Sequence, residues 1–179
     1  MEAKEHKKKF QILARTDSLT NIYNRYGFDG LAEKMISKNP QTHFVAALLD
    51  IDDFKFINDI YGHSYGDRAL KSLADSMKAF FPSDALLGRN GGDEFGILLP
   101  NCTFKEVTEQ MQQFTKLPKT FSYMGKSQQL YISLGYAEYP TFASSYSQLM
   151  RCADAALYEI KLHGKNGCMA YREGLQSGV

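Results

Sequence analysis

The stretch RNGGDEFGILLP, residues 89–100, places two adjacent glycines directly before two carboxylates and then continues into an apolar run. A second apolar segment, DALLGRN at 84–90, precedes the glycines. A tight hairpin turn needs positive φ, which glycine adopts at little cost, so Gly91 and Gly92 predict a two-residue β-hairpin between two strands. Without side chains, the glycines also leave the backbone open to a bulky anion beside the two acids.

The composition is typical of one soluble globular domain. The chain has 179 residues, 44% of them hydrophobic and 13% aromatic, which is enough to bury one sizeable core. Lys and Arg total 21 against 20 for Asp and Glu, and this net charge of +1 argues against nucleic acid or an anionic membrane as a partner. Three widely spaced cysteines argue against a disulfide framework or zinc site and favour a reducing, cytoplasmic setting: Cys102, Cys152 and Cys168.

The chain is expected to divide into a connector, a domain and a tail. Residues 1–14 are polar and rich in lysine, typical of a basic helical connector from an upstream region. The sequence contains neither a run of 18 apolar residues nor a signal-peptide pattern. The globular domain is predicted over 15–173 and a C-terminal tail over 174–179. A longer protein could still be tethered to a membrane through a region upstream of this sequence.

Hydrophobic spacing predicts intermixed helices and strands. The continuous apolar run HFVAALLDI at 43–51 is typical of a central strand buried on both faces. Segment 16–37 is interpreted as two helices with a turn between them, and Asp67 as the start of a further helix. The helix that begins at Asp67 is predicted over 67–81, further helices over 104–117 and 145–164, a strand over 130–140, and a hairpin arm or edge strand over 165–172. Together these elements predict an α/β sandwich with a mixed sheet.

Acidic residues gather where the predicted strands end. Asp50, Asp52 and Asp53 close the buried strand, and Asp93 and Glu94 follow the glycine pair. Like charges this close repel one another in a partly dry site, so the cluster indicates a bound cation. Carboxylates together with substrate phosphates suit Mg²⁺. Taken singly, each acid could instead cap a helix or stay solvated.

Four segments resemble motifs of the GGDEF family of diguanylate cyclases and occur in the family's order. They are DSLTNIYNR at 17–25, DIDDFKFINDIYGHSYGD at 50–67, GGDEF at 91–95 and ADAALYEIKLHGKNG at 153–167. The resemblance implies a palm-like α/β sandwich of the nucleotidyl cyclase type, with a central mixed, mostly antiparallel sheet, surrounding helices and a glycine-tipped hairpin. It also implies condensation of two GTP into cyclic di-GMP with release of two pyrophosphates, assisted by Mg²⁺ or alternatively Mn²⁺.

The resemblance assigns catalytic roles to residues at the two acidic strand ends. Asp50, the backbone carbonyl of Ile51 and Asp93 are expected to hold Mg²⁺, and Glu94 to help deprotonate the attacking 3′-hydroxyl. Two metal ions can lower the pKa of that hydroxyl and stabilise the leaving pyrophosphate. Strict alternation along a strand would point Glu94 away from Asp93 unless the hairpin tip is strongly twisted.

The resemblance places phosphate-binding groups at both ends of the chain. Lys55 and the backbone amides near Asp53 and Phe54 are expected to meet the terminal phosphates of GTP, as are Lys161 and Lys165. Lys161 also fits a purely structural role, because any cation in the last turn of a helix gains from the helix dipole.

Three polar residues match family positions around the base. Asn58 and Asp67 line up with residues that read the guanine edge, whose acceptor and donor groups an amide and a carboxylate can meet. Asp67 could equally be a helix cap, and His63, which matches a position near the nucleotide, could be only structural in a glycine-rich turn. In the family a serine at position 67 goes with acceptance of ATP, so the aspartate here favours GTP in both halves of the product.

The sequence also departs from the family pattern. PSDA at 82–85 replaces an R-x-x-D feedback site, so product inhibition there is not expected. Asn90 and Gly96 stand where bulkier residues are commoner and are expected to loosen the hairpin without removing a catalytic group.

One domain offers one GTP site, so a reaction between two GTP molecules implies a homodimer, with a sensor or stalk expected upstream. Two other functions remain open. The chain could be a catalytically weak module that binds GTP as a regulatory domain, or a scaffold that only dimerises. The scaffold would leave the clustered acids without purpose.

Overall fold

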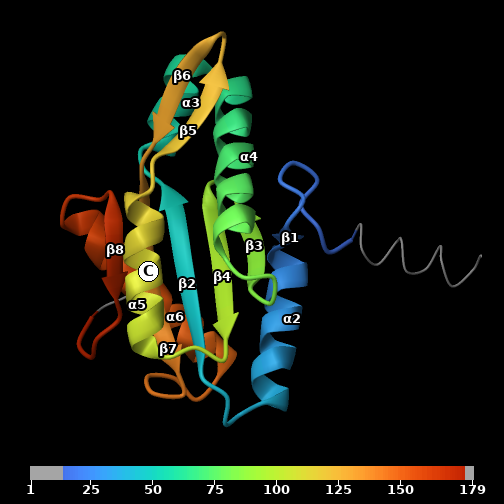
Figure 1. Cartoon of the computed structure of the whole chain (residues 1–179), viewed down its shortest axis with the longest axis vertical. Helices are drawn as coiled ribbons and strands as arrows, with labels where there is room; N and C mark the ends of the chain where they lie inside the picture. The colour runs from blue at the N-terminus through green and yellow to red at the C-terminus, as the bar shows by residue number, and fades with distance from the viewer. Residues whose placement is uncertain (1–13, 176–179) are drawn as a thin grey trace, which may run out of the picture.

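The protein is described here by a computed structural model, which covers residues 14–175 and folds them around a six-stranded sheet (Figure 1). The strands of this sheet are β1 (Tyr23–Asn24), β2 (Phe44–Ile51), β3 (Leu86–Gly91), β4 (Glu94–Pro100), β7 (Ile132–Tyr139) and β8 (Gly167–Ala170). The helices are α2 (Arg25–Lys38), α3 (Phe54–Tyr61), α4 (His63–Phe80), α5 (Phe104–Lys116) and α6 (Tyr146–Leu162). Strands β5 (Lys119–Tyr123) and β6 (Lys126–Leu130) form a separate hairpin. Most of the predicted connector and tail lie outside the described residues.

The sheet has the order β1-β3-β4-β2-β7-β8. Strand β2 lies at its centre, antiparallel to both β4 and β7, and seven of its eight residues are buried, as the apolar run predicts. Strands β3 and β4 are also antiparallel, whereas the outer pairs β1–β3 and β7–β8 are parallel. The prediction of a mixed, mostly antiparallel sheet is confirmed, and β8 is the edge strand rather than a hairpin arm.

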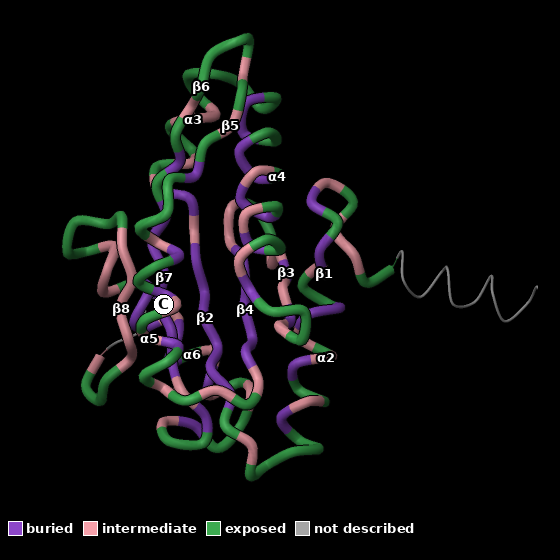
Figure 2. Tube along the Cα trace, in the orientation of Figure 1, coloured by how far each residue is buried: buried purple, intermediate pink, exposed green. Residues whose placement is uncertain are grey.

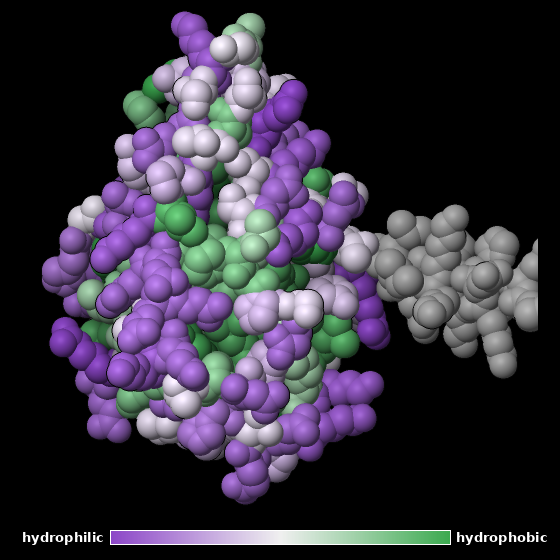
Figure 3. Space-filling view, in the orientation of Figure 1, coloured by the Kyte–Doolittle hydropathy of each residue, from purple (hydrophilic) through white to green (hydrophobic). Residues whose placement is uncertain are grey.

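Helices cover both faces of the sheet. The apolar sides of α4 and α5 pack on one face, and those of α2 and α6 pack on the other. Figure 2 shows the central strands buried between the exposed outer surfaces of these helices. This arrangement is the predicted α/β sandwich. The side chains on the face in view are mostly hydrophilic, with hydrophobic ones between α4 and α5 (Figure 3). Within residues 14–175, no helix combines the length and apolarity needed to cross a membrane.

Segment 16–37 forms one helix, so the prediction of two helices is wrong. Asn24 is the N-cap of α2, and its side chain accepts a hydrogen bond from the Gly27 backbone amide at 2.9 Å. Before it, the carboxylate of Asp17 accepts bonds from the amide and the hydroxyl of Thr20 at 2.9 and 2.6 Å. Such local bonds from short polar side chains compete with helix formation. A glycine is needed at position 27 of the helix because any side chain would collide with the preceding segment: a Cβ there would lie 2.3 Å from the carbonyl oxygen of Arg15.

Helix α4 begins four residues before its predicted start. Gly62, at φ 82°, is the N-cap, and His63 is the first helical residue rather than part of a turn. Asp67 therefore lies in the second turn of the helix, and its interpretation as a helix cap is wrong. The glycine-rich sequence conceals the helix because Gly66 is a packing residue: a Cβ there would lie 2.0 Å from Asn58 Oδ1.

A pair of glycines in the sheet makes room for α2. Gly88 of β3 and Gly96 of β4 are opposite each other, and the ring of Phe28 lies against both. A Cβ on Gly88 would come within 2.7 Å of the Phe28 side chain, and one on Gly96 within 2.9 Å. Phe28 is fully buried. Gly96 therefore anchors the hairpin to α2, which is the opposite of the loosening expected from the sequence.

Candidate functional site

The glycine-tipped hairpin joins β3 to β4, as predicted, but its turn is displaced by one residue. Gly91 pairs with Glu94, so the two turn residues are Gly92 and Asp93 instead of the two glycines. Gly91 and Gly92 have φ values of 140° and 54°, which glycine adopts readily. The displacement arises because Asn90 is an extra residue in β3, a β-bulge. The side chain of Asp93 thus projects from the turn itself.

Arg89 fixes this turn. Its Nε and Nη2 atoms donate to the carbonyl oxygen of Gly92 at 2.9 and 2.7 Å, and Nη1 donates to Asp17 Oδ1 at 3.2 Å. Burial acts to raise the pKa of Asp17, but bonds from Thr20 and the charge of Arg89 outweigh it and hold the pKa below its usual value. Sequence reasoning missed Arg89, although its place two residues before the glycines was a signal. Arg89 therefore links the hairpin turn to the segment around Asp17 at the start of the domain.

Asp50 is the electrostatic centre of the site. It lies near the end of β2, and Lys161 of α6 donates to its Oδ2 atom. Its Oδ1 atom is buried and accepts no hydrogen bond from the residues described. Burial chiefly, with the charges of Asp93 and Glu94, raises the pKa of Asp50 to about 6 despite the opposing effect of Lys161. Lys161 therefore compensates the cost of ionising this buried carboxylate only in part.

Asp93 lies beside Asp50 in the same pocket. Burial raises the pKa of Asp93, while its own backbone amide and the charges of Lys161 and Arg89 act to lower it. The pocket has a volume of about 470 Å³ and brings together most of the residues predicted for metal and phosphate. Its lining consists of Asp50, Ile51, Asp52, Asp53, Phe54, Lys55, Phe56, Asp59, Asp93, Lys161 and Lys165.

Glu94 opens onto a different pocket. It is directly opposite Asp50 across β2 and β4, so the two side chains share a face of the sheet. Asn90 Nδ2 donates to Glu94 Oε1 at 3.0 Å, and Glu94 lines a space of about 490 Å³ between α2 and α6. Asp93 does not border this second pocket. Glu94 is thus close enough to raise the pKa of Asp50. It does not line the pocket that holds Asp50 and Asp93.

The residues predicted to read guanine lie on α3 and α4, beyond the lining of the Asp50 pocket. Asn58 is one turn after Lys55 on α3, and its buried Oδ1 atom accepts no hydrogen bond from the described residues. His63 and Asp67 are exposed on the first two turns of α4. Their predicted roles stay predictions, as do those of Gly91 and Gly92 in the hairpin.

The loop after β2 and the turn after α6 are bonded to each other. Lys165 Nζ donates to Asp53 Oδ1 at 2.6 Å, and the Asn166 amide donates to Asp52 Oδ2 at 2.9 Å. The hydroxyl of Ser133 in β7 donates to Asp52 Oδ1 at 2.6 Å. The family resemblance predicted that Lys165 and the backbone near Asp53 both meet the GTP phosphates, whereas nothing in the sequence pointed to the partners of Asp52.

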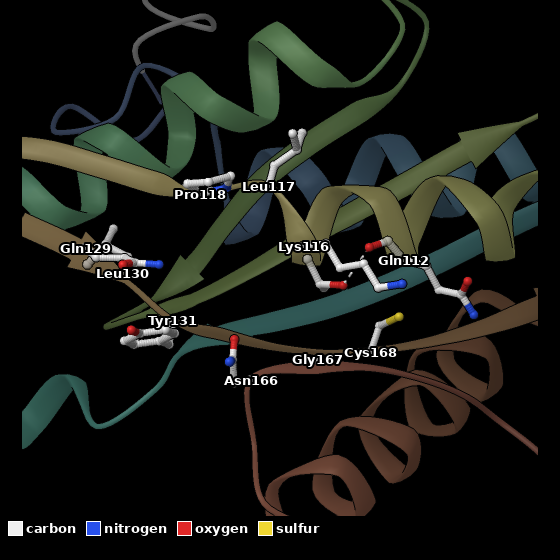
Figure 4. A pocket seen from close by; sticks show the side chains of 11 residues that line it. Gln112, Lys116, Leu117, Pro118, Gln129, Leu130, Tyr131, Asn166, Gly167 and Cys168 are labelled. Atoms are coloured by element: carbon white, nitrogen blue, oxygen red, sulfur yellow. Dashed lines mark hydrogen bonds between the residues drawn. The ribbon is translucent and has the colours of Figure 1, made fainter.

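A further pocket, of about 380 Å³, lies behind this turn (Figure 4). Tyr131 and Asn166 line one end of it, and Gln112, Lys116 and Cys168 line the other. The pocket contains none of the residues predicted for catalysis. Two of its lining residues, Tyr131 and Asn166, are hydrogen-bonded to Asp52 of the main site.

A metal ion would need more than side chains from this chain. Among residues 14–175, no three His, Cys, Asp or Glu side chains are grouped so that they could hold a metal ion. The residues present still fit one that substrate phosphates also bind: Asp50 offers a buried oxygen without a partner, and Asp93 lies beside it. Hard oxygen donors of this kind suit Mg²⁺ or Mn²⁺.

Comparison with known proteins identifies the family of the chain. The sequence matches the family described as "Diguanylate cyclase, GGDEF domain" over residues 14–167. It is 35% identical over 165 residues to the uncharacterized protein YhcK of Bacillus subtilis, covering 89% of this chain and 46% of that protein. It is 31% identical over 165 residues to the probable diguanylate cyclase DgcC of Escherichia coli K12, covering 90% and 44%. The chain thus spans less than half the length of these relatives.

A solved structure shares the fold. The coiled coil and GGDEF domain of DgcB from Caulobacter crescentus, in complex with c-di-GMP, superimposes with a TM-score of 0.84 at 28% identity, covering 94% of this chain and 92% of that one. With a family match over most of the chain, a common fold and four motifs in order, the chain belongs to the GGDEF-domain family of diguanylate cyclases.

Proposed function

We propose that this chain is the catalytic domain of a diguanylate cyclase, which condenses two GTP into cyclic di-GMP and releases two pyrophosphates. The observation that carries the proposal is the convergence of Asp50 and Asp93 in one pocket, with a buried Asp50 oxygen that lacks a partner among the described residues. Family membership supplies the reaction, and the pocket supplies groups suited to it.

A divalent cation, Mg²⁺ or Mn²⁺, would be held by Asp50, Asp93 and the backbone carbonyl of Ile51. When bound, it would acidify the 3′-hydroxyl and stabilise negative charge on the transferring phosphate. The raised pKa values of the two acids mean that their ionised forms are poorly compensated, and a cation would reverse this. Lys161 would then be released from Asp50 to meet a phosphate.

The remaining groups would bind and orient GTP. Lys55 and Lys165 lie at the pocket with the acids, where they suit the terminal phosphates, together with the backbone near Asp53 and Phe54. The backbone of the hairpin would face the nucleotide. On α3 and α4, Asn58, His63 and Asp67 would surround guanine. The Asn58 oxygen, which is buried against Gly66 and lacks a partner among the described residues, would have to turn outward to accept from the N–H groups of the base.

The proton acceptor would have to move before it could act. Glu94 would turn from the second pocket and give up its bond from Asn90 in order to reach a 3′-hydroxyl beside Asp93. Glu94 is proposed for this role because it directly follows the turn that carries Asp93. Its replacement should therefore lower kcat with little change in the affinity for GTP.

The reaction would need two chains, because each contributes one GTP and two must meet. We place the domain at 15–173 in a longer cytoplasmic or membrane-tethered protein, with the basic connector over 1–14 leading from a sensor or stalk. Since residues 82–85 lack the feedback motif, cyclic di-GMP should not slow the enzyme through that segment.

The test is incubation of the chain with GTP and Mg²⁺ at high protein concentration, with products separated by chromatography. The native chain should give cyclic di-GMP and pyrophosphate in a one-to-two ratio. Asp93→Ala should give neither, whereas Asp75→Ala, which alters an exposed carboxylate on α4, should behave as native. If GTP stays intact but raises the melting temperature, the regulatory GTP-binding module replaces the cyclase.

A further inference from the structure

Asp52 differs from Asp50 because both of its carboxylate oxygens accept a hydrogen bond. Its Oδ1 accepts from the buried Ser133 hydroxyl at 2.6 Å, and its Oδ2 accepts from the Asn166 amide at 2.9 Å. Its own amide donates to the carbonyl oxygen of Tyr131 at 2.9 Å. Asp50, by contrast, keeps a buried oxygen without a partner among the described residues. A metal ion at Asp52 would have to compete with bonds that join three segments of the chain.

The turn that Asp52 holds has an uncommon backbone. Gly164, Lys165 and Asn166 have φ values of 109°, 61° and 48° in succession. Residues other than glycine rarely adopt positive φ, and they keep it only where the surroundings enforce it. Two contacts do so here: the Lys165 amide donates to the Ile160 carbonyl at 3.0 Å, and the Asn166 amide donates to Asp52.

This turn sets the position of a phosphate-binding candidate. The left-handed backbone at 165 directs the Lys165 ammonium to Asp53, and both side chains line the pocket with Asp50 and Asp93. If the bond from Asn166 to Asp52 were lost, the turn could relax and the ammonium would no longer be held at the pocket.

We propose that Asp52 is a positioning residue that holds Lys165 at the phosphate end of the pocket, and that it is not a metal ligand. The three acids at the end of β2 and in the loop after it then have separate roles. Asp50 faces the cation, Asp52 fixes the turn after α6, and Asp53 receives Lys165. This inference rests on the proposed function for the identity of the nucleotide, GTP.

The first variants separate geometry from charge. Asp52→Asn removes the charge but can keep both contacts, because the amide oxygen can accept from Asn166 while its NH₂ group donates to the Ser133 hydroxyl. It should retain a KM for GTP within about threefold of native and an unchanged Mg²⁺ requirement. Asp52→Ala removes both acceptors and should raise KM about tenfold with kcat nearly unchanged.

A double-mutant cycle tests whether Asp52 acts through the lysine. Lys165→Met should raise KM to an extent similar to Asp52→Ala, and the two changes combined should do no more than Lys165→Met alone. Ser133→Ala, which leaves the carboxylate in place, should give a smaller rise in KM and keeps the test available if Asp52→Ala does not fold. Asp75→Asn is the matched control.

Calorimetric titration with a non-hydrolysable GTP analogue should be run on every variant beside the kinetics. The proposal is overturned if Asp52→Asn is as damaging as Asp52→Ala and needs more Mg²⁺, or if the effects of Asp52→Ala and Lys165→Met multiply. A native chain that binds the analogue without forming cyclic di-GMP would instead overturn the proposed function, and the binding cycle would still decide the role of Asp52.

Discussion

Lys161 of α6 donates a hydrogen bond to the carboxylate of Asp50 in β2, 111 residues earlier in the chain, and so supplies positive charge where a cation is proposed. Lys161→Met should therefore destabilise the metal-free protein, by about 1–2 kcal/mol because the lysine is partly exposed. Thermal unfolding in EDTA measures this. Mg²⁺ should raise the melting temperature more in the variant than in the native chain, since the metal no longer competes with an ammonium group.

The control for this change is Lys78→Met, which removes an exposed ion pair with Asp75 on α4. Its effect should stay below about 0.5 kcal/mol, and Mg²⁺ should not alter it. Equal destabilisation by the two substitutions would show that the Lys161–Asp50 ion pair stabilises the protein no more than an exposed surface pair.

Arg89 should matter for rate more than for binding. Its two bonds to the Gly92 carbonyl fix the turn that carries Asp93. Arg89→Met should lower kcat by about 10-fold to 100-fold, because small displacements of a catalytic group are costly, while the affinity for a GTP analogue changes little. Arg68→Met, on the exposed side of α4, should leave kcat unchanged. A native kcat in Arg89→Met would contradict the role of Arg89 in holding the turn that carries Asp93.

Gly96 should resist even the smallest side chain. Gly96→Ala would bring a Cβ to 2.9 Å from the ring of the fully buried Phe28 and should destabilise the fold by about 1–3 kcal/mol. Gly30→Ala has open space around its Cβ inside α2 and should stabilise by up to about 1 kcal/mol. Chemical denaturation of both variants measures the contrast. If Gly96→Ala were as stable as the native chain, the packing of Phe28 against Gly96 would not matter for stability, and the expectation that this glycine loosens the hairpin would stand.

Lys119 should give the fold a pH dependence outside the site. It is buried, caps the end of α5 by donating to the carbonyl oxygens of Phe114 and Leu117, and has its pKa lowered by burial to about 8. Between pH 8 and the ordinary lysine pKa, the unfolded chain binds more protons than the folded one, so this residue's contribution to stability rises with pH.

The comparison that isolates Lys119 is its replacement by methionine. The free energy of unfolding of the native chain, relative to Lys119→Met, should increase by about 1–3 kcal/mol between pH 7.5 and pH 10. Denaturant titrations across that range measure it. A difference that does not vary with pH would mean that the two carbonyls and the Phe114 ring, 4.2 Å from the ammonium, keep Lys119 charged throughout.

Short-range patterns in the sequence were enough for much of the fold. The apolar run of β2 predicted a central strand, and the spacing after Thr103 predicted α5, which that residue caps together with Glu106. Gly66 and Gly96 misled because a glycine signals flexibility in the sequence, whereas here each makes room for a side chain from a neighbouring helix. Such packing depends on the partner, Asn58 or Phe28, and leaves no local pattern.

The candidate site was predictable where family motifs mark it, and less so elsewhere. The motifs singled out Asp50, Asp93 and Lys161, and in the structure these three residues line one pocket. The bulge at Asn90 moved Asp93 into the turn, and cross-strand register decided which pocket Glu94 faces. Register and bulges arise from pairing between strands, so they could not be derived from either strand alone.

Asp50 and Asp93 are proposed to hold jointly the cation on which GTP turnover depends. The most direct test is the rate of cyclic di-GMP formation at saturating GTP as Mg²⁺ is titrated, for the native chain, Asp50→Asn, Asp93→Ala and the control Asp75→Asn. We predict no product from any of them in EDTA, saturable rates for the native chain and the control, and losses of about 100-fold or more for the other two. A native rate and Mg²⁺ dependence in either Asp50→Asn or Asp93→Ala would contradict the claim.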